Sequence, residues 1–288
     1  MFFEKESQTG LMCAFLRAHH LRTNGFSVFD DPMCRALPRE KYDQVYASIA
    51  KGQSFFGSEK GSTDAVINAY LAGEVVARTA FHQNRLRTAV QLGARQVVQL
   101  GAGLDFTGYG QGSLPRSVCI FDVDSAPVLA QKTALLAQMP TAYPRVPVTG
   151  DLTGEDWANR LVAAGFSPWK QAYFALLGLT QYLDAVTFDR LVRYVSLLAA
   201  PGSTLVLDWD RPAAQIRALA ASAGAPMEQT ADLPQVIHSL RRHGFLIYEQ
   251  MEQLEIGRTY LQRYNQIYQE KPMHLLGSPV FLLAVRRA

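Results

Sequence analysis

Residues 96–105 read Gln-Val-Val-Gln-Leu-Gly-Ala-Gly-Leu-Asp, an apolar run that ends directly in a glycine turn. The pattern predicts a buried strand over Gln96–Leu100 and a tight turn at Gly101-Ala102-Gly103. Two glycines one residue apart let the backbone approach a ligand that a Cβ would hold away. Taken alone, the turn is equally compatible with a dinucleotide site or with a plain strand-ending turn.

Outward from this stretch, short apolar runs alternate with helical patterns as far as the C-terminus. The predicted strands are Gln96–Leu100, Ser117–Phe121, Arg145–Val148, Ala172–Leu177, Ser203–Asp208, Phe245–Gln250 and Val280–Arg286. The predicted helices between them are Ser125–Met139, Glu155–Ala164, Thr187–Leu198, Leu233–His243 and a stretch around Arg258–Gln266. This alternation favours an α/β fold, a mostly parallel sheet with helices on both faces. Seven strands exceed the six of a dinucleotide-binding fold.

Acidic residues at two strand ends and in the turn favour a nucleoside ligand without a pyrophosphate. Asp124 ends the second strand roughly twenty residues after the glycines, where an acid holds both ribose hydroxyls of a nucleoside. Asp105, inside the turn, would repel a pyrophosphate but tolerates a cationic sulfonium. After the third strand, Asp151 and Leu152 suit the amino group and ring of adenine; the alternative is that Asp151 caps the following helix.

Upstream of residue 93 the pattern is helical and contains no convincing strand. A helix is predicted over Leu11–Leu21, a break at Asp31-Pro32, and a long helical run from Ser62 to Gly93 with a kink at Gly73. We therefore expect an N-terminal helical cap over 1–92 and a cofactor-binding α/β domain over 93–288. The segment around 251–279 is too long for a hairpin turn and is expected to form a lid insertion.

Composition and charge exclude several function classes. The 288 residues carry a formal net charge of +3, with Lys and Arg scattered among acids. The densest basic cluster, Arg241-Arg242-His243, suits a helix end rather than nucleic acid. No stretch approaches the roughly 18 apolar residues of a membrane span, and the N-terminus lacks a signal peptide. Because Cys13, Cys34 and Cys119 lack metal-ligand spacing, we expect no metal and a cytoplasmic location.

These motifs together resemble the leucine carboxyl methyltransferase family, and within it the bacterial polyketide O-methyltransferases of the tetracenomycin type. The resemblance implies a class I methyltransferase fold, S-adenosylmethionine as cofactor and S-adenosylhomocysteine as product. The matching segments are Ser7-Gln8-Thr9, Arg17-Ala18, Phe29-Asp30-Asp31-Pro32, Ala77-Arg78-Thr79, Gly93–Asp105, Asp122-Val123-Asp124 with Lys132, Gly178–Leu183 and Pro201-Gly202-Ser203.

By position, the resemblance also implies a cofactor site. Its residues would be Arg17, Arg78, Gly101, Ala102, Gly103, Asp122, Asp124, Asp151, Leu152 and Leu177. The two arginines would clamp the methionine carboxylate, for which a guanidinium fork is well shaped. Many members have an Arg at Gly110, so one polar contact is missing here. The eukaryotic branch has a Glu at Leu177, which argues against a protein C-terminus as substrate.

Methyl transfer mainly requires nucleophile and methyl carbon to be aligned at about 3 Å. A carboxylate acceptor needs no general base, whereas a phenol would benefit from one, and the sequence offers no dedicated base. Tyr182 is the catalytic and substrate-side candidate, although it suits a packing role equally well; Asp208 is a weaker candidate.

We expect a monomer or homodimer that methylates a carboxyl or hydroxyl group of a small polyketide or aromatic natural product. One alternative is a carboxyl methyltransferase acting on a protein C-terminus. The others are an NAD(P)-dependent oxidoreductase and a non-catalytic nucleoside-binding module.

Overall fold

The computed structural model describes residues 8–30, 37–52, 62–108, 114–137, 144–222, 227 and 231–288. The predictions for Asp31-Pro32, Cys34 and Gly110, and the match at Ser7, lie outside the described residues.

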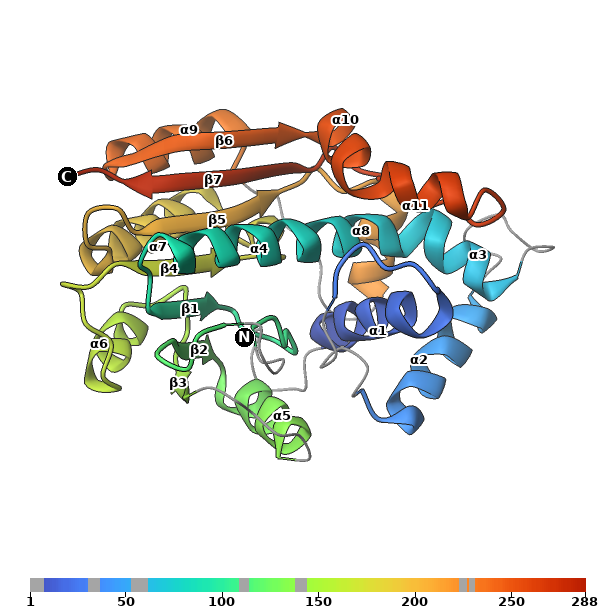
Figure 1. Ribbon diagram of the computed structural model, residues 1–288, viewed down its shortest axis with the longest axis horizontal. Coiled ribbons are helices and arrows are strands. Elements are labelled where there is room, and N and C mark those ends of the chain that lie inside the picture. The colour runs from blue at the N-terminus through green and yellow to red at the C-terminus, as the bar shows by residue number, and fades with distance from the viewer. Residues whose placement is uncertain are drawn as a thin grey trace.

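A single seven-stranded sheet forms the centre of the structure (Figure 1). Its strands are β1 (Gln96–Leu100), β2 (Cys119–Asp124), β3 (Arg145–Thr149), β4 (Ala172–Leu176), β5 (Thr204–Trp209), β6 (Phe245–Glu252) and β7 (Val280–Arg286). They lie in the order β3-β2-β1-β4-β5-β7-β6. The first five are parallel, and β7 runs antiparallel to both of its neighbours. The predicted seven-stranded, mostly parallel sheet is confirmed.

Helices cover both faces of the sheet because the central strands are buried on both sides. In β1, Val97 belongs to one hydrophobic core and its neighbour Val98 to the other. The first face carries α4 (Gly73–Gln91) and α5 (Ala126–Leu136). The second carries α6 (Asp156–Ala163), α7 (Ala185–Leu198) and α9 (Leu233–Arg242). Helix α8 (Ala214–Ser222) follows β5.

The N-terminal helices precede the sheet in the chain and lead into it. They are α1 (Gln8–Thr23), α2 (Arg39–Lys51) and α3 (Thr63–Ile67), with a π-helical turn, η3 (Asn68–Ala72), between α3 and α4. Where a kink at Gly73 is expected, the structure has this π-helical turn, which ends directly before Gly73. A Cβ at Gly73 would lie 2.1 Å from the carbonyl oxygen of His274. Glycine is therefore needed because the segment before β7 crosses here.

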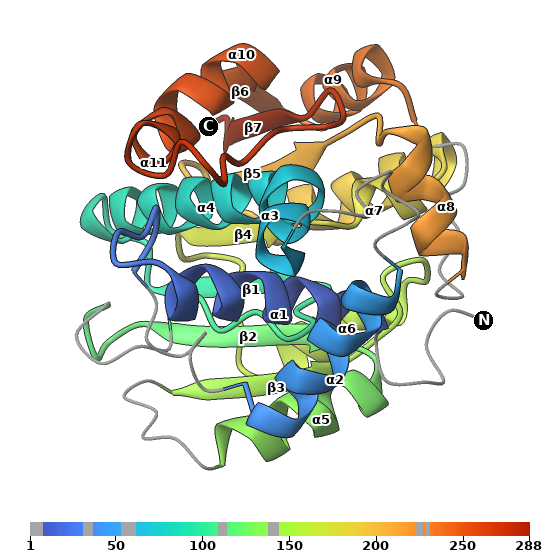
Figure 2. The ribbon, with the colours of Figure 1, turned by 90° about the vertical axis from the view of Figure 1, so that its right-hand side faces the viewer.

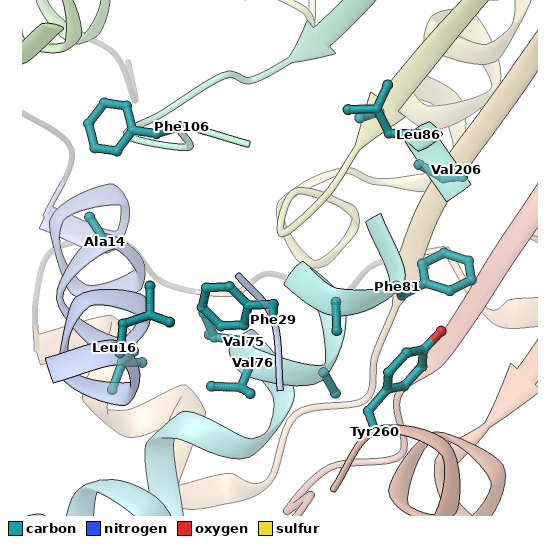
Figure 3. Packing of buried hydrophobic residues seen from close by; sticks show 14 of the residues in the cluster. Ala14, Leu16, Phe29, Val75, Val76, Phe81, Leu86, Phe106, Val206 and Tyr260 are labelled. Atoms are coloured by element: carbon teal, nitrogen blue, oxygen red, sulfur yellow. The ribbon is translucent and has the colours of Figure 1, made fainter. Parts of the chain in front are cut away.

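The segment between β6 and β7 is helical, as expected: α10 (Gln253–Ile256), η5 (Gly257–Leu261) and α11 (Gln262–Ile267). Its Tyr260 joins one hydrophobic cluster with Leu16 of α1, Phe81 of α4 and Val206 of β5 (Figure 3). The N-terminal helices, the insertion and the first face of the sheet therefore share a core. The division at residue 92 and the lid role of the insertion stay predictions.

The arrowheads of β1 and β5 point toward the side on which α1, α2 and α8 lie, and Figure 2 looks onto that side. None of the described helices combines the length and the apolar composition needed to cross a membrane.

Candidate functional site

The strand order places the candidate site at the carboxyl ends of β1, β2 and β4. β1 lies between β2 and β4, so the order of the chain reverses at this strand. In open α/β sheets, ligands bind beyond the carboxyl ends of the strands at such a reversal. The glycine turn follows β1, Asp124 ends β2, and Gly178 lies two residues after β4.

The glycine turn adopts a backbone that favours glycine. Gly101 and Gly103 have φ values of 66° and 46°. The N–H groups of Gly101 and Ala102 both donate to the carbonyl of Val123, at 2.9 and 3.1 Å. A Cβ at Gly101 would lie 2.2 Å from Leu179 Cδ1, whereas one at Gly103 would meet nothing closer than 3.9 Å. Packing against Leu179 therefore requires the first glycine, and the space beside the second is open.

Asp124 is tied directly to the turn. Its Oδ2 accepts the N–H of Gly103 at 2.8 Å, and its Oδ1 accepts the N–H of Ser125 at 2.7 Å. Burial raises the pKa of this carboxyl, and the two N–H donors partly offset the shift. Each carboxylate oxygen accepts more than one hydrogen bond, so both retain capacity for ribose hydroxyls. These hydrogen bonds tie this acid to the turn.

Asp122 has a different role from its neighbour. It is fully buried and accepts from Lys132 Nζ at 2.9 Å and from Arg145 Nε at 3.0 Å. Lys132 also donates to Gln99 Oε1 at 3.0 Å. This network ties α5 and β3 to β2, and a role of Asp122 in cofactor binding stays a prediction.

A cleft of about 580 Å³ lies beside Asp124 at the carboxyl ends of β2 and β3. Its lining residues are Ser125, Ala126, Pro127, Thr149, Gly150, Asp151, Gly154, Glu155, Asp156 and Arg160. The volume is that of an ordinary small-molecule pocket.

At this cleft, Asp151 Oδ1 accepts the N–H and the hydroxyl of Thr153, at 2.9 and 2.7 Å. The alternative that Asp151 caps the next helix is wrong, because α6 begins at Asp156 and Glu155 is its N-cap. Leu152 is buried in the core, so its contact with an adenine ring stays a prediction.

The turn lacks the features of a pyrophosphate site. In the described stretches 101–108 and 114–118, no helix begins after the turn to present its N-terminal amides. Burial would raise the pKa of Asp105, but Arg17, His82, Lys132 and the N–H of Thr107 outweigh it and lower the pKa. The carboxylate therefore stays ionised beside the turn.

The two arginines expected at the methionine end come from α1 and α4. Arg17 Nη2 donates to the carbonyl of Leu104 in the turn at 2.6 Å. Arg78 Nη1 donates to Asp208 Oδ2 at 2.7 Å, and Asp208 Oδ1 accepts the N–H of Gly178 at 2.6 Å. Asp208 is thus fully buried as the partner of Arg78, and its contact with a substrate stays a prediction.

Leu177, another expected cofactor residue, is half-buried directly before Gly178 and packs against the first core. Tyr182 ends a short 3-10 turn, η4 (Thr180–Tyr182), after β4. Burial raises its pKa to about 12, although hydrogen bonds with Gln181 and Thr9 oppose the shift. Such a phenol stays protonated at neutral pH, where it does not serve as a general base.

Three buried or half-buried groups lie near these arginines, and sequence reasoning missed two of them, Glu74 and Asp210. His82 Nδ1 lies 2.8 Å from the hydroxyl of Tyr173, and burial lowers the pKa of this histidine to about 4. Glu74 and Asp210 lie beside Arg78 and Asp208. The spacing of Glu74 from Arg78 on one helix, and of Asp208 from Asp210 at one strand end, is a sequence signal that could have identified the last two.

Comparison with known proteins adds independent information. A model of the leucine carboxyl methyltransferase family matches residues 10–196. A putative S-adenosyl-L-methionine-dependent methyltransferase of Bacillus subtilis, YktD, is 27% identical over 282 residues, covering 89% of this chain and 91% of the relative. One from Mycolicibacterium vanbaalenii is 30% identical over 234 residues, 77% of this chain and 73% of the relative. A putative S-adenosyl-L-methionine-dependent methyltransferase from Parafrankia is 36% identical over 179 residues, which are 62% of this chain but only 56% of the relative.

Two solved structures match nearly the whole chain. A putative methyltransferase from Thermobifida fusca has a TM-score of 0.54 and 17% identity, covering 96% of this chain and 94% of its own. A DUF574 family protein from Streptomyces avermitilis has a TM-score of 0.55 and 12% identity, covering 95% and 96%. With the strand order above, these neighbours show the class I methyltransferase fold.

Proposed function

Since the chain belongs to the leucine carboxyl methyltransferase family, whose named relatives are S-adenosylmethionine-dependent methyltransferases, we propose that it methylates an oxygen of a small molecule. The acceptor we propose is a polyketide or aromatic natural product. The observation that supports the cofactor most directly is the bond between Asp124 and the turn at Gly103. Asp124, which we propose binds the ribose, thereby lies against a turn that no helix follows within the described stretches 101–108 and 114–118.

Residues of the cleft and of the neighbouring strand ends and helices fit this cofactor. Asp124 has acceptor capacity for the ribose, and Asp151 lines the neighbouring pocket, where the adenine amino group would donate to it. Arg17 and Arg78 supply cations where the methionine carboxylate would lie. When bound, the cofactor supplies a methyl carbon already activated by its sulfonium.

The chain's own contribution is mainly binding and alignment. The turn and Asp124 hold the nucleoside in one orientation, and the arginines hold the other end of the molecule. An acceptor oxygen aligned at about 3 Å from the methyl carbon then reacts with a large entropic advantage. Thr9 of α1 is hydrogen-bonded to Tyr182 after β4, so α1 would help to exclude water if the acceptor binds on this side.

A protein C-terminus as acceptor is less well supported, because Leu177 replaces the acid of the eukaryotic branch. An oxidoreductase is less well supported because the turn has no helix among its described neighbours and holds the ionised Asp105.

The test is a screen of methyl transfer from labelled S-adenosylmethionine to a panel of phenols and aromatic carboxylic acids. We expect label in at least one small molecule, and the base lability of the product separates esters from ethers. Transfer only to protein C-termini, or to no acceptor of either class, would contradict the proposal.

A further inference from the structure

The cleft beside Asp124 extends beyond the position of the ribose. Its described lining residues come from the start of α5, the end of β3, the loop after β3 and the beginning of α6. The glycine turn and β4, near which the methionine end of the cofactor would lie, contribute none of these described lining residues. Of the proposed cofactor, the purine is therefore the part that reaches into this cleft, from the side of Asp124.

The inner end of the cleft has an unused hydrogen-bonding group. Ser125, directly after Asp124, is 8% exposed, and its Oγ has no hydrogen-bond partner among the described residues. Ser125 is the N-cap of α5, yet its side chain caps no N–H, and Pro127 in the first turn has none to offer. A buried hydroxyl at the inner end of a cleft gains a hydrogen bond when a ligand atom reaches it.

The outer part of the cleft is open. On the side of β3 and α6, the lining residues Thr149, Asp151, Glu155, Asp156 and Arg160 are all exposed. The volume of about 580 Å³ lies in the range of pockets that hold a drug-sized molecule, which is larger than a purine. A purine bound between Ser125 and Asp151 therefore leaves space that leads out to solvent along α6.

The exocyclic amino group is the part of the purine that faces this space. In the proposed binding mode this group donates to Asp151, an exposed residue between β3 and α6. The ribose hydroxyls, in contrast, would face Asp124, which is 8% exposed and bonded to the turn. An amino nitrogen that carries one chain keeps one N–H, so the contact with Asp151 survives the substitution.

The outer rim has a negative net charge. It contains Asp151, Glu155 and Asp156, and Arg160 is the one base among the described lining residues. Arg160 Nη2 lies 3.8 Å from Asp156 Oδ2, so these two charges largely neutralise each other. Glu155 also accepts a hydrogen bond from the hydroxyl of Tyr194, which leaves its charge in place. Because exposed charges interact weakly through water, the rim favours a cation by a few-fold in affinity.

We propose that the nucleoside site is open at its adenine end, so that it binds S-adenosyl ligands that carry a flexible chain on the exocyclic amino group, and prefers a positively charged chain to a negatively charged one. The inference rests on the proposed function, because it takes the adenine to lie between Ser125 and Asp151. It goes further by assigning the outer rim to a second chemical group. The chain leaves along α6, on the side away from the glycine turn and β4.

The first experiment is a calorimetric titration of the wild-type protein with three ligands. They are S-adenosylhomocysteine and its derivatives with an aminohexyl or a carboxypentyl chain on the exocyclic amino group. The aminohexyl ligand should bind within about threefold of the parent, and at low ionic strength about threefold or more tighter than the carboxypentyl ligand. At about 1 M salt the difference between the two chains should fall below about twofold.

The matched control ligand carries the same aminohexyl chain on a ribose hydroxyl. That chain would be directed at Asp124 and the turn, so the affinity should fall about tenfold or more, as for the loss of a charge-assisted hydrogen bond. Equal affinities of the two aminohexyl ligands would overturn the proposal, because the opening would then not be specific to the adenine end.

The second experiment reverses one charge of the rim. Glu155→Lys should lower the ratio of the aminohexyl affinity to the carboxypentyl affinity by about twofold or more. The control is Glu252→Lys, an exposed position of β6 at the opposite edge of the sheet from β3, which should leave the ratio unchanged. A ratio that changes equally in both variants, or in neither, overturns the proposed role of the rim.

The outcomes separate this inference from the proposed function. An aminohexyl ligand that binds more than about threefold more weakly than S-adenosylhomocysteine shows a closed adenine end and overturns the inference, while the cofactor assignment stands. A wild-type protein that does not bind S-adenosylhomocysteine itself refutes the proposed function instead.

Discussion

Replacing Lys132 with methionine tests whether the Asp122 network holds the cofactor-binding edge together. Both side chains are fully buried, with Nζ 2.9 Å from the carboxylate. Removing one partner of a buried ion pair costs 3–5 kcal/mol. Because Arg145 still contacts Asp122 at 3.0 Å, we expect the lower end, about 3 kcal/mol. For 288 residues with an unfolding entropy of about 2.1 cal/mol/K each, a loss of about 3 kcal/mol in the free energy of unfolding lowers the Tm by about 5 °C.

The assay is urea unfolding with a thermal melt, and Lys170→Met, at an exposed position, is the control. The double variant Lys132→Met/Asp122→Asn should lose more than the single one, because the largely buried Arg145 then also lacks its counter-charge. A single variant that loses less than about 1 kcal/mol, or a double variant more stable than the single one, would refute this reasoning.

Three further predictions concern backbone and pH. Gly101→Ala should lower the free energy of unfolding in urea by about 2–4 kcal/mol, because strain at positive φ adds to the clash with Leu179. Gly103→Ala, which has no such clash, should lower it by about 1 kcal/mol. Equal losses in the two variants would contradict the inferred packing of Gly101 against Leu179. Burial lowers the pKa of His20 to about 3, so this histidine stays neutral in the folded protein while it is protonated in the unfolded chain. The free energy of unfolding of the wild type should therefore fall by about 2–3 kcal/mol between pH 7 and pH 4.5, and that of His20→Gln should fall by less. Parallel pH dependences of the two proteins would refute this. Because its pKa is raised to about 6, ionised Asp210 destabilises the folded protein above about pH 6. As pH rises from about 4 to 6, the free energy of unfolding of Asp210→Asn should therefore increase relative to that of the wild type. A difference between the two proteins that does not change with pH would contradict this.

The strands that could be predicted well are short runs of mainly apolar, β-branched or aromatic residues. Gln96–Leu100 and Val280–Arg286 match β1 and β7 at both ends. The second strand was placed too early, at Ser117–Phe121, whereas β2 runs over Cys119–Asp124. Two carboxylates within four residues look like the end of a strand. They are accommodated inside β2 because Lys132 and Arg145, which come later in the chain, neutralise Asp122.

Helices with a weak apolar stripe were missed. In α2 only Val45 and Ile49 are buried, which is too little periodic signal to predict a helix over Arg39–Lys51. α8 was also not predicted.

In the candidate site, too, the features that could be predicted from the sequence are the local ones. The turn and Asp124 are local signals within one strand–turn–strand unit and were identified from the sequence. The pairing of Glu74 with Asp210 joins a helix before the sheet to the fifth strand, and only the fold brings them together.

The central claim is that the turn and Asp124 bind the nucleoside of S-adenosylmethionine. Calorimetric titration of the wild type and Asp124→Ala with S-adenosylhomocysteine, and with NADH as comparator, tests it most directly. We predict micromolar binding of S-adenosylhomocysteine that Asp124→Ala weakens about tenfold or more, as for loss of a charge-assisted hydrogen bond, and no binding of NADH. Binding of NADH without S-adenosylhomocysteine, or unchanged affinity in Asp124→Ala, would contradict the account.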